Sequence, residues 1–295
     1  MALSVFLLLI LVCFSDCGGF SHPATDVEGH SGSPAGSLSI GAFNIQIFGL
    51  DKMEDEVAVA NIIEILKRYD LVLIQEIRDS SETAIFDLLD QFNTAVAPRT
   101  YGISISERLG RTSSKEQYAF FYDQSIFTVL DEYTYHDNSD VFEREPYIVT
   151  FGVTGYSISE FAYLAIHSKP DDAVAELDYL VRVYDESIGN GAVPTSNWLF
   201  GGDFNADCTY VGPGDWDSIS LWTDTRFSWI IDNDADSTVS VTTDCAYDRF
   251  VLSGNLDQHF VSGSSVVYDY WADMDLTEQE ALDVSDHYPV EMDFN

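Results

Sequence analysis

Basic side chains are scarce in this sequence. Lys and Arg total 13 against 50 Asp and Glu, which gives a formal charge of −37 at pH 7. Charged residues make up only 21% of the 295 residues, so the acidity reflects missing base and not acidic runs. Proteins that dock on nucleic acid through a broad basic face neutralise many phosphates. That class of binder is therefore disfavoured.

Long apolar runs are absent after the first 14 residues. Residues 1–14 read MALSVFLLLILVCF and carry no charged side chain, and the polar and glycine-containing segment 15–19 follows. About 20 apolar residues are needed to span a bilayer, so this run is short for a membrane anchor, which is the alternative. We interpret residues 1–19 as a secretory signal peptide. We therefore expect a soluble, secreted protein with no membrane partner.

Cysteine is equally sparse, with four in the whole chain. Cys13 and Cys17 lie in or beside the predicted signal, which leaves Cys208 and Cys245. In an oxidising compartment two cysteines most simply form one disulfide, and two free buried thiols are the alternative. No Cys/His cluster has the spacing of a zinc site.

The apolar content is sufficient for a large core. Hydrophobic residues make up 46% and aromatic residues 14% of the chain, which excludes disorder, collagen and coiled coil. Residues 20–37 are rich in Gly, Ser and Pro and predict a flexible N-terminal segment. No internal repeat and no second linker interrupts residues 38–295, so we expect one domain there.

Hydrophobic periodicity predicts more strands than helices. Strands are expected at 38–48, 71–76, 101–106, 117–122, 127–135, 147–154, 159–167, 197–205, 227–231, 247–252, 266–271 and 288–294. Helices are expected at 55–69, at 81–92 with Ser80 or Ser81 as its N-cap, at 171–187 and at 277–284. This order favours an α/β sandwich, in which helices flank two packed, mainly antiparallel or mixed sheets, over a doubly wound parallel sheet.

Polar residues stand at the ends of strands that otherwise look buried. A carboxylate such as Glu76, which closes the apolar run LVLIQE, is costly to bury unless it is paired or binds a cation. The complete set is Asn44, Glu76, His167, Asp203 with Asn205, Asp248, and Asp286 with His287. Oxygen ligands with imidazole favour Mg²⁺ or Mn²⁺ over zinc, and two histidines with separate acids suggest a general acid and a general base. This equipment suits attack on phosphorus.

The sequence also resembles the deoxyribonuclease I family. The motifs that carry this resemblance span residues 38–294 in the family's order: SIGAFNIQIFG (39–49), LVLIQEIRDS (71–80), LGRTSSKEQYAFFY (109–122), FEREP (142–146), LAIHSKPDDAVAELDYL (164–180), GDFNADCTYV (202–211), DCAYDR (244–249) and SDHYPVE (285–291). The resemblance implies a four-layered α/β sandwich. It also implies metal-dependent endonucleolytic cleavage of double-stranded DNA to 5′-phosphate and 3′-hydroxyl ends.

The resemblance assigns metal and phosphate ligands. Glu76 would be the main magnesium ligand, with Asn44 and Asp203 beside it. Asp286 would lie next to the metal or to His167. Two further residues would meet the substrate: Asn205 would hold the scissile phosphate or the attacking water, and Tyr247 would lie near the phosphate.

It also implies two histidine–carboxylate pairs. His167 would pair with Glu116, and His287 would pair with Asp248. In this assignment His287 is the base and His167 the acid. Two arginines complete the implied site: Arg78 would contact the minor groove and Arg144 the DNA backbone. Cys208 and Cys245 match the family's main disulfide.

The sequence departs from the family in several places. Gln46 stands where the family usually has Arg, and Ser114 where it often has Tyr. The family's small second disulfide is absent because residues 131–145 contain no Cys. A calcium site could still form there, with the ligands Asp137, Asp140 and Glu145. The second calcium loop, around 236–243, is altered in length, and the partly kept segment 103–107 leaves actin binding open.

Two other functions compete with DNA cleavage. One is a phosphodiesterase or phosphatase of the same superfamily that acts on a lipid or inositol phosphate. The other is a non-catalytic binding protein, which the presence of both histidines and Glu76 disfavours. We expect a monomer. The large negative charge, with Gln46 and Ser114 replacing contacts to DNA, further predicts a nuclease that tolerates salt.

Overall fold

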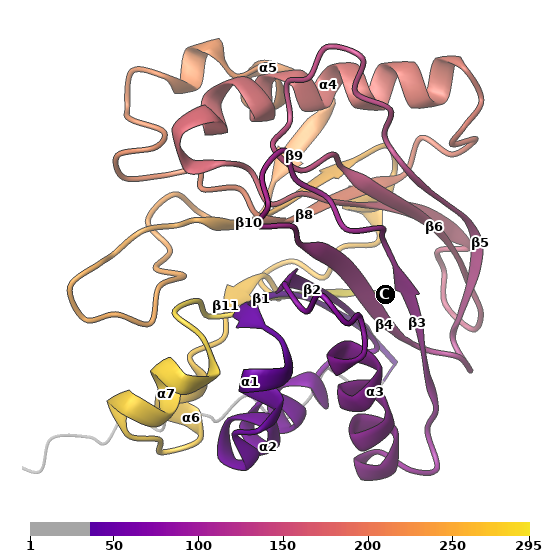
Figure 1. Cartoon of the computed structure of the whole chain (residues 1–295). Coiled ribbons are helices and arrows are strands. Elements are labelled where there is room, and N and C mark those ends of the chain that lie inside the picture. Colours follow the sequence, from indigo (N-terminus) through magenta and orange to yellow (C-terminus); the bar gives the residue numbers. More distant parts are fainter. Residues whose placement is uncertain (1–35) are drawn as a thin grey trace, which may run out of the picture. The chain divides into compact units, whose positions relative to one another are not determined.

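The computed structural model describes residues 36–295, so the predicted signal peptide and most of the segment 20–37 lie outside the described residues. This part of the chain contains two mixed six-stranded sheets (Figure 1). The first has the order β11 (Val266–Val267), β12 (Val290–Phe294), β1 (Leu38–Phe48), β2 (Leu71–Ile77), β4 (Gln117–Asp123), β3 (Tyr101–Ile105). The second has the order β5 (Phe127–Thr134), β6 (Tyr147–Val153), β7 (Glu160–Ala165), β8 (Trp198–Asp203), β10 (Asp248–Ser253), β9 (Phe227–Trp229).

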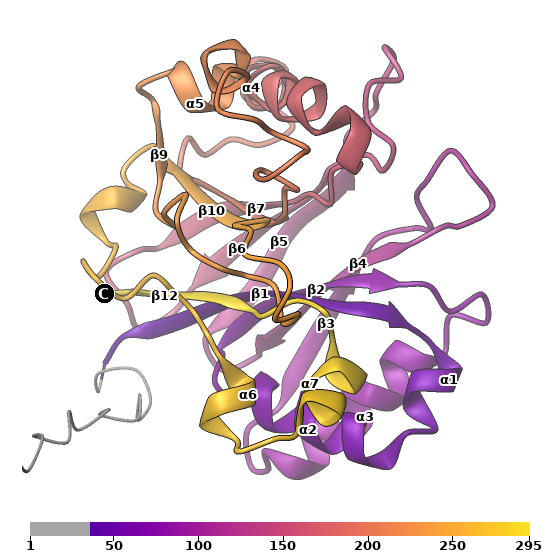
Figure 2. The same ribbon diagram turned by 90° about the vertical axis from the view of Figure 1, so that its left-hand side faces the viewer.

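Helices cover the outer face of each sheet (Figures 1 and 2). Beside the first sheet lie α1 (Leu50–Met53), α2 (Glu56–Leu66), α3 (Ala84–Ala95), α6 (Tyr270–Asp273) and α7 (Glu278–Val284). Beside the second lie α4 (Ala173–Gly189), preceded by a 3₁₀ turn at Pro170–Asp172, and α5 (Ser220–Thr223). Further 3₁₀ turns occur at Trp216–Ser218 and Leu256–Gln258. The layers are therefore helix, sheet, sheet and helix, which confirms the predicted α/β sandwich.

Three hydrophobic clusters join these four layers. Along β2, Val72 and Ile74 pack toward α2 and α3, whereas Leu71 and Leu73 belong to the cluster between the two sheets. A third cluster packs α4 on the second sheet. Because successive side chains of a strand point to opposite faces, a strand covered on both faces needs an uninterrupted apolar run. This explains the run LVLI in β2.

Each sheet has one parallel pair, connected through a helix. Strands β1 and β2 are parallel and joined through α2, and strands β7 and β8 are parallel and joined through α4. The remaining neighbours are antiparallel. The polar residues predicted at strand ends lie where these parallel strands finish, or where β10 and β12 begin.

Two local predictions were wrong. Residues 266–271 do not form one strand: β11 ends at Val267, and the Asp269 carboxylate accepts a hydrogen bond from the Ala272 N–H to start α6. Neither Ser80 nor Ser81 caps α3. The Asp79 carboxylate instead accepts the N–H groups of Thr83 and Ala84 at 2.8 and 2.9 Å. In both places an aspartate carboxylate accepts backbone N–H groups at the start of a helix, which replaces the predicted strand in one case and the predicted serine cap in the other. No helix within residues 36–295 has the length and apolar character to cross a membrane.

Candidate active site

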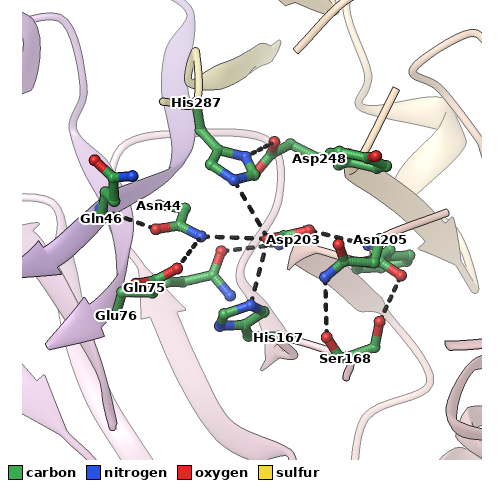
Figure 3. Close-up of polar contacts among 12 residues, drawn as sticks. Asn44, Gln46, Gln75, Glu76, His167, Ser168, Asp203, Asn205, Asp248 and His287 are labelled. Atoms are coloured by element: carbon green, nitrogen blue, oxygen red, sulfur yellow. Dashed lines mark hydrogen bonds and ion pairs between the residues drawn. The ribbon is translucent and has the colours of Figure 1, made fainter. Parts of the chain in front are cut away.

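The site lies where the two sheets meet (Figure 3). Three side chains come from the carboxyl-terminal parts of strands: Asn44 in β1, Glu76 in β2 and Asp203 at the end of β8. His167 follows β7, while Asp248 opens β10 and His287 precedes β12. The structure thus brings together residues that are up to 243 positions apart in the chain.

Asp203 is the centre of this cluster. Its Oδ2 lies 3.4 Å from His167 Nε2 and 3.7 Å from His287 Nε2, and it accepts a hydrogen bond of 3.2 Å from Asn44 Nδ2. Its Oδ1 accepts the Asn205 N–H at 3.0 Å. The two imidazoles therefore face one buried carboxylate from different sheets, as Figure 3 shows.

The first pair is His167 with Glu116. The distance from His167 Nδ1 to Glu116 Oε2 is 2.9 Å, and both side chains are buried. Arg78 and Arg144 approach Glu116 Oε1 at 2.8 and 3.3 Å. Burial opposes ionisation of Glu116, but the contacts with His167, Arg144 and Arg78 outweigh it and lower the pKa of this carboxyl to about 2. Glu116 is therefore a fixed negative charge behind the imidazole.

The second pair is His287 with Asp248. The distance from His287 Nδ1 to Asp248 Oδ2 is 2.8 Å. Burial opposes protonation of the imidazole, yet Asp248, Asp203 and Asp286 together raise the pKa of His287 well above its ordinary value. Asp248 Oδ1 is buried and has no hydrogen-bond partner within residues 36–295. Asp248 Oδ1 is thus an acceptor oxygen that none of these residues uses.

Glu76 stands at a bulge between β1 and β2. Its Oε1 accepts a hydrogen bond from Asn44 Nδ2 at 3.1 Å, and its Oε2 accepts the Ile47 N–H at 2.9 Å. The backbone is left-handed at Gln46, Ile47 and Glu76, with φ of 38°, 50° and 58°. Such conformations are rare for these residue types and turn the strand ends toward the site.

These residues include groups that could hold a metal. One ligand atom from each of Asp203, Asp248 and His287 lies within 4.8 Å of the other two. Glu76 is linked to Asp203 through the shared Asn44 amide. The amide nitrogen of Asn44, and not its oxygen, faces the carboxylates. Asn44 thus orients Glu76 and Asp203, and its role as a metal ligand stays a prediction.

The other predicted site residues lie around this centre. Asn205 donates its side-chain N–H to the Ser168 carbonyl at 3.0 Å. The Tyr247 ring lies 6.3 Å from the His287 ring, and burial raises the pKa of its hydroxyl to about 12. Asp286 Oδ1 is 3.8 Å from His287 Nε2. Asp286 is therefore beside His287.

The two arginines differ in how far they are buried. The Arg144 side chain is only 10% exposed and donates to the backbone carbonyls of His167 and Ser168 at 2.9 and 3.2 Å. The Arg78 side chain is 30% exposed and bonds Glu76 and Glu116. Arg144 thus supports the backbone beside His167, which the sequence analysis did not foresee.

Two buried polar residues that support the site were missed. Gln75 bonds the second sheet twice, through the Ile166 carbonyl at 2.8 Å and the Asp203 N–H at 2.9 Å. This approach requires glycine at 202, where φ is +128° and a Cβ atom would lie 2.3 Å from a backbone oxygen. Ser285 bonds the Asn44 carbonyl at 2.6 Å and accepts the His287 N–H. The sequence signal that could have revealed Gln75 is its position inside the otherwise apolar strand β2.

The predicted bridge between Cys208 and Cys245 is present, with Cα atoms 5.8 Å apart. It connects the segment after Asp203 to the segment before Asp248. The predicted calcium ligands are not brought together in the same way. Among residues 36–295, Asp137, Asp140 and Glu145 form no group with three ligand atoms within 4.8 Å. Asp140 instead pairs with Arg111 at 3.0 Å.

Comparison with known proteins places this site in a family. Residues 41–287 match the Endonuclease/Exonuclease/phosphatase family, and the chain belongs to that family. Over 265 residues it is 45% identical to deoxyribonuclease-1 of Homo sapiens, covering 87% of this chain and 92% of that protein. Deoxyribonuclease gamma of Mus musculus is 42% identical over 261 residues, covering 86% of this chain and 84% of that protein. The resemblance to the deoxyribonuclease I family is confirmed.

Solved structures support the fold. An endonuclease/exonuclease/phosphatase from Bacteroides vulgatus has a TM-score of 0.60 at 15% identity, covering 88% of this chain and 98% of that one. The human Nocturnin catalytic domain has a TM-score of 0.59 at 15% identity, with 88% and 94% covered. At these identities the likeness concerns the sandwich alone.

Proposed function

We propose that this protein is a secreted, metal-dependent endonuclease that hydrolyses phosphodiester bonds of double-stranded DNA, leaving 5′-phosphate and 3′-hydroxyl ends. One observation carries the proposal. Two imidazoles, each backed by its own carboxylate at 2.8–2.9 Å, point their Nε2 atoms at the same acidic centre. Hydrolysis of a phosphodiester needs one proton removed from water and one given to the leaving oxygen.

The residues fit a hard divalent cation. Glu76 and Asp203 offer carboxylate oxygens, and the unpartnered Asp248 Oδ1 offers a third. Oxygen donors of this kind suit Mg²⁺ or Mn²⁺. Bound there, the cation would supply charge stabilisation to the phosphate oxygens. Asp286 would add to the negative field, and calcium at Asp137, Asp140 and Glu145 stays a prediction.

The chain's own groups would divide the proton transfers. One histidine takes a proton from water as the water oxygen bonds to phosphorus. The bond from phosphorus to the 3′ oxygen breaks, and the other histidine protonates that oxygen. The carboxylates around His287 favour its imidazolium form, which suits a donor and is opposite to the assignment from resemblance. A cation on Asp203 would act against that protonation.

Substrate contacts would come from both sheets. Asn205 and Tyr247 lie close enough to His287 and Asp203 to meet the scissile phosphate. Arg78 is exposed enough to reach a groove, whereas Arg144 holds the backbone of His167 and would act on the phosphate through that position. Secretion rests on the predicted signal peptide and on the disulfide, which suits an oxidising compartment.

A plasmid assay tests the proposal. Supercoiled plasmid is incubated with Mg²⁺, with and without chelator, using wild-type protein, His167→Ala and His136→Ala. His136 is an exposed histidine outside the site and serves as the control. Nicking that requires both the metal and His167, with His136→Ala unaffected, supports the proposal. Phosphate release from inositol phosphates or lipid phosphates without nicking would support the competing function instead.

A further inference from the structure

Arg78 joins two carboxylates that have different tasks in the proposed mechanism. The same nitrogen, Nη2, lies 3.0 Å from Glu76 Oε2 and 2.8 Å from Glu116 Oε1. Glu76 belongs to the proposed metal site, and Glu116 orients His167. The arginine therefore neutralises part of the metal site from inside the protein.

This pose leaves Arg78 incompletely satisfied. Its Nε is buried and has no hydrogen-bond partner within residues 36–295, while the side chain as a whole is 30% exposed. A buried donor without a partner costs free energy, and moving outward would return it to water or to a ligand. Outward movement of the Arg78 guanidinium is therefore favoured once its attraction to Glu76 is weakened.

A cation bound to Glu76 would weaken the attraction between this carboxylate and Arg78. A dication and a guanidinium that share one carboxylate repel each other, and the repulsion is strong where solvent screens weakly. Glu116 would keep its charge balance without Arg78, because Arg144 also approaches its Oε1, at 3.3 Å. The His167 pair can therefore stay intact while Arg78 moves.

We propose that Arg78 is a metal-responsive positioning residue. It occupies Glu76 when the cation is absent and is released toward DNA when the cation binds, so that metal loading and DNA binding favour each other. The proposal rests on the proposed function, because it takes Glu76 as a metal residue and Arg78 as a contact to DNA. Coupling of this kind is reciprocal: each ligand raises the affinity for the other by the same factor.

The first test measures metal binding without DNA. Titration calorimetry with Mn²⁺ compares wild type, Arg78→Met and Arg182→Met. Arg182 lies on α4 and pairs with Glu186 at 2.6 Å, so its replacement removes the same charge away from the site. We expect Arg78→Met to bind Mn²⁺ on the order of tenfold more tightly, within the usual range of coupling between sites. Equal affinities in all three proteins would overturn the proposal.

The second test uses the wild-type protein, so it does not depend on the folding of a variant. Phenylglyoxal modifies accessible guanidinium groups, and mass spectrometry gives the extent at each arginine. We expect Arg78 to react faster after Mn²⁺ is added, Arg182 to react equally in both states, and buried Arg144 to stay protected. An Arg78 rate that is unchanged by metal contradicts the release step. Both tests are made without DNA, so a failure to cleave plasmid would count against the proposed function separately.

Discussion

The two histidine–carboxylate pairs share one geometry but have different surroundings. Glu116 behind His167 receives two arginines, Arg78 and Arg144. Asp248 behind His287 forms no ion pair with Lys or Arg within residues 36–295, and His287 has Asp203 and Asp286 as further acidic neighbours. One pair is thus embedded among cations and the other among anions.

This difference separates two otherwise equivalent imidazoles. Acid–base catalysis at one pH needs groups whose environments push their protonation apart. The acids around His287 favour its protonated form, whereas His167 lies between Glu116, which two arginines help keep ionised, and the shared Asp203. The two pairs therefore differ in the charge that surrounds their carboxylates, and this difference can be tested experimentally.

The largest effect is expected from removing either imidazole. His167→Ala and His287→Ala should each lower kcat/KM for plasmid cleavage by about 10²–10⁴-fold, the usual contribution of a general acid or base. The double variant should lose less than the product, since both groups serve one reaction. Circular dichroism should show an unchanged fold. Losses below about fivefold in both single variants would show that the pairs do not carry the chemistry.

The disulfide lies closer in the chain to Asp248 of the second pair than to either residue of the first pair. Cys208 and Cys245 are 37 positions apart and connect the segments that lead from Asp203 and to Asp248. Replacing both by Ser should lower the free energy of unfolding by roughly 3–4 kcal/mol, from the chain-entropy model for a loop of this length. Urea unfolding measures the loss.

The variant without the disulfide also tests whether His167 and His287 respond differently to a change near Asp248. Its histidine NMR signals should shift more for His287 than for His167, because Asp248, the partner of His287, follows shortly after Cys245 in the chain. Equal shifts at both imidazoles would mean that the pairs are structurally coupled. Two free thiols in the secreted wild-type protein, found by mass spectrometry, would remove the basis of this prediction.

The free energy of unfolding should depend on pH in the acid range through Glu116 and in the neutral to alkaline range through His287. The lowered pKa of Glu116 stabilises the fold above its unfolded value of about 4.5, and this contribution is lost as the pH falls through about 2. The difference corresponds to roughly 3 kcal/mol. The raised pKa of His287 stabilises the fold below an unfolded value of about 6.5, and this is lost as the pH rises through the folded value.

Unfolding of metal-free protein across pH checks this pattern. Glu116→Gln should flatten the acid limb of the stability curve, and Asp248→Asn should flatten the alkaline limb. The opposite assignment, or a change in the same limb for both variants, would contradict the electrostatic difference between the pairs.

The sequence alone predicted the helix and sheet layers of the fold better than the histidine–carboxylate pairs of the site. Apolar runs such as 71–74 and the amphipathic helices determine local structure, so most elements were placed correctly. The link between Glu116 and His167 came from resemblance. In the segment SKEQY this carboxylate looks solvated, yet it is only 3% exposed. Burial of a charge depends on distant partners, here Arg78 and Arg144, which no local pattern reveals.

Other misses have the same physical cause. Gln75 acts across the sheet interface, and its task becomes visible only when β8 packs against β2. The failed strand at 266–271 contains β-forming aromatics, but Asp269 caps a helix within it. The Tyr270 hydroxyl also bonds the Ala281 and Ser285 carbonyls at 3.0 Å, which holds that turn against α7. Tertiary contacts outweighed local preference in these places.

The smallest effect expected is that of salt, and it depends on where the few cations lie. Each of the 13 Lys and Arg side chains has an ion-pair or hydrogen-bond partner within the described residues. Nine form ion pairs: Lys67, Arg68, Arg78, Arg99, Arg111, Arg144, Lys169, Arg182 and Arg226. Four donate to backbone carbonyls: Lys52, Arg108, Lys115 and Arg249. The direct attraction to phosphates that salt weakens is therefore small, while the repulsion between DNA and a protein of charge −37 is large.

At 1 M salt the screening length is about 3 Å, so the long-range repulsion vanishes while short contacts in the site persist. By the resemblance, Gln46 and Ser114 replace an Arg and a Tyr that would contact DNA, so we expect fewer direct contacts to be lost. We expect kcat/KM on duplex DNA to stay level or rise across a sodium chloride series at fixed Mg²⁺. Gln46→Arg adds a cation near Glu76, and with this direct attraction to phosphate present kcat/KM should fall as salt rises. A steep decline in wild type below physiological ionic strength would mean that the acidity faces away from the DNA and only aids solubility.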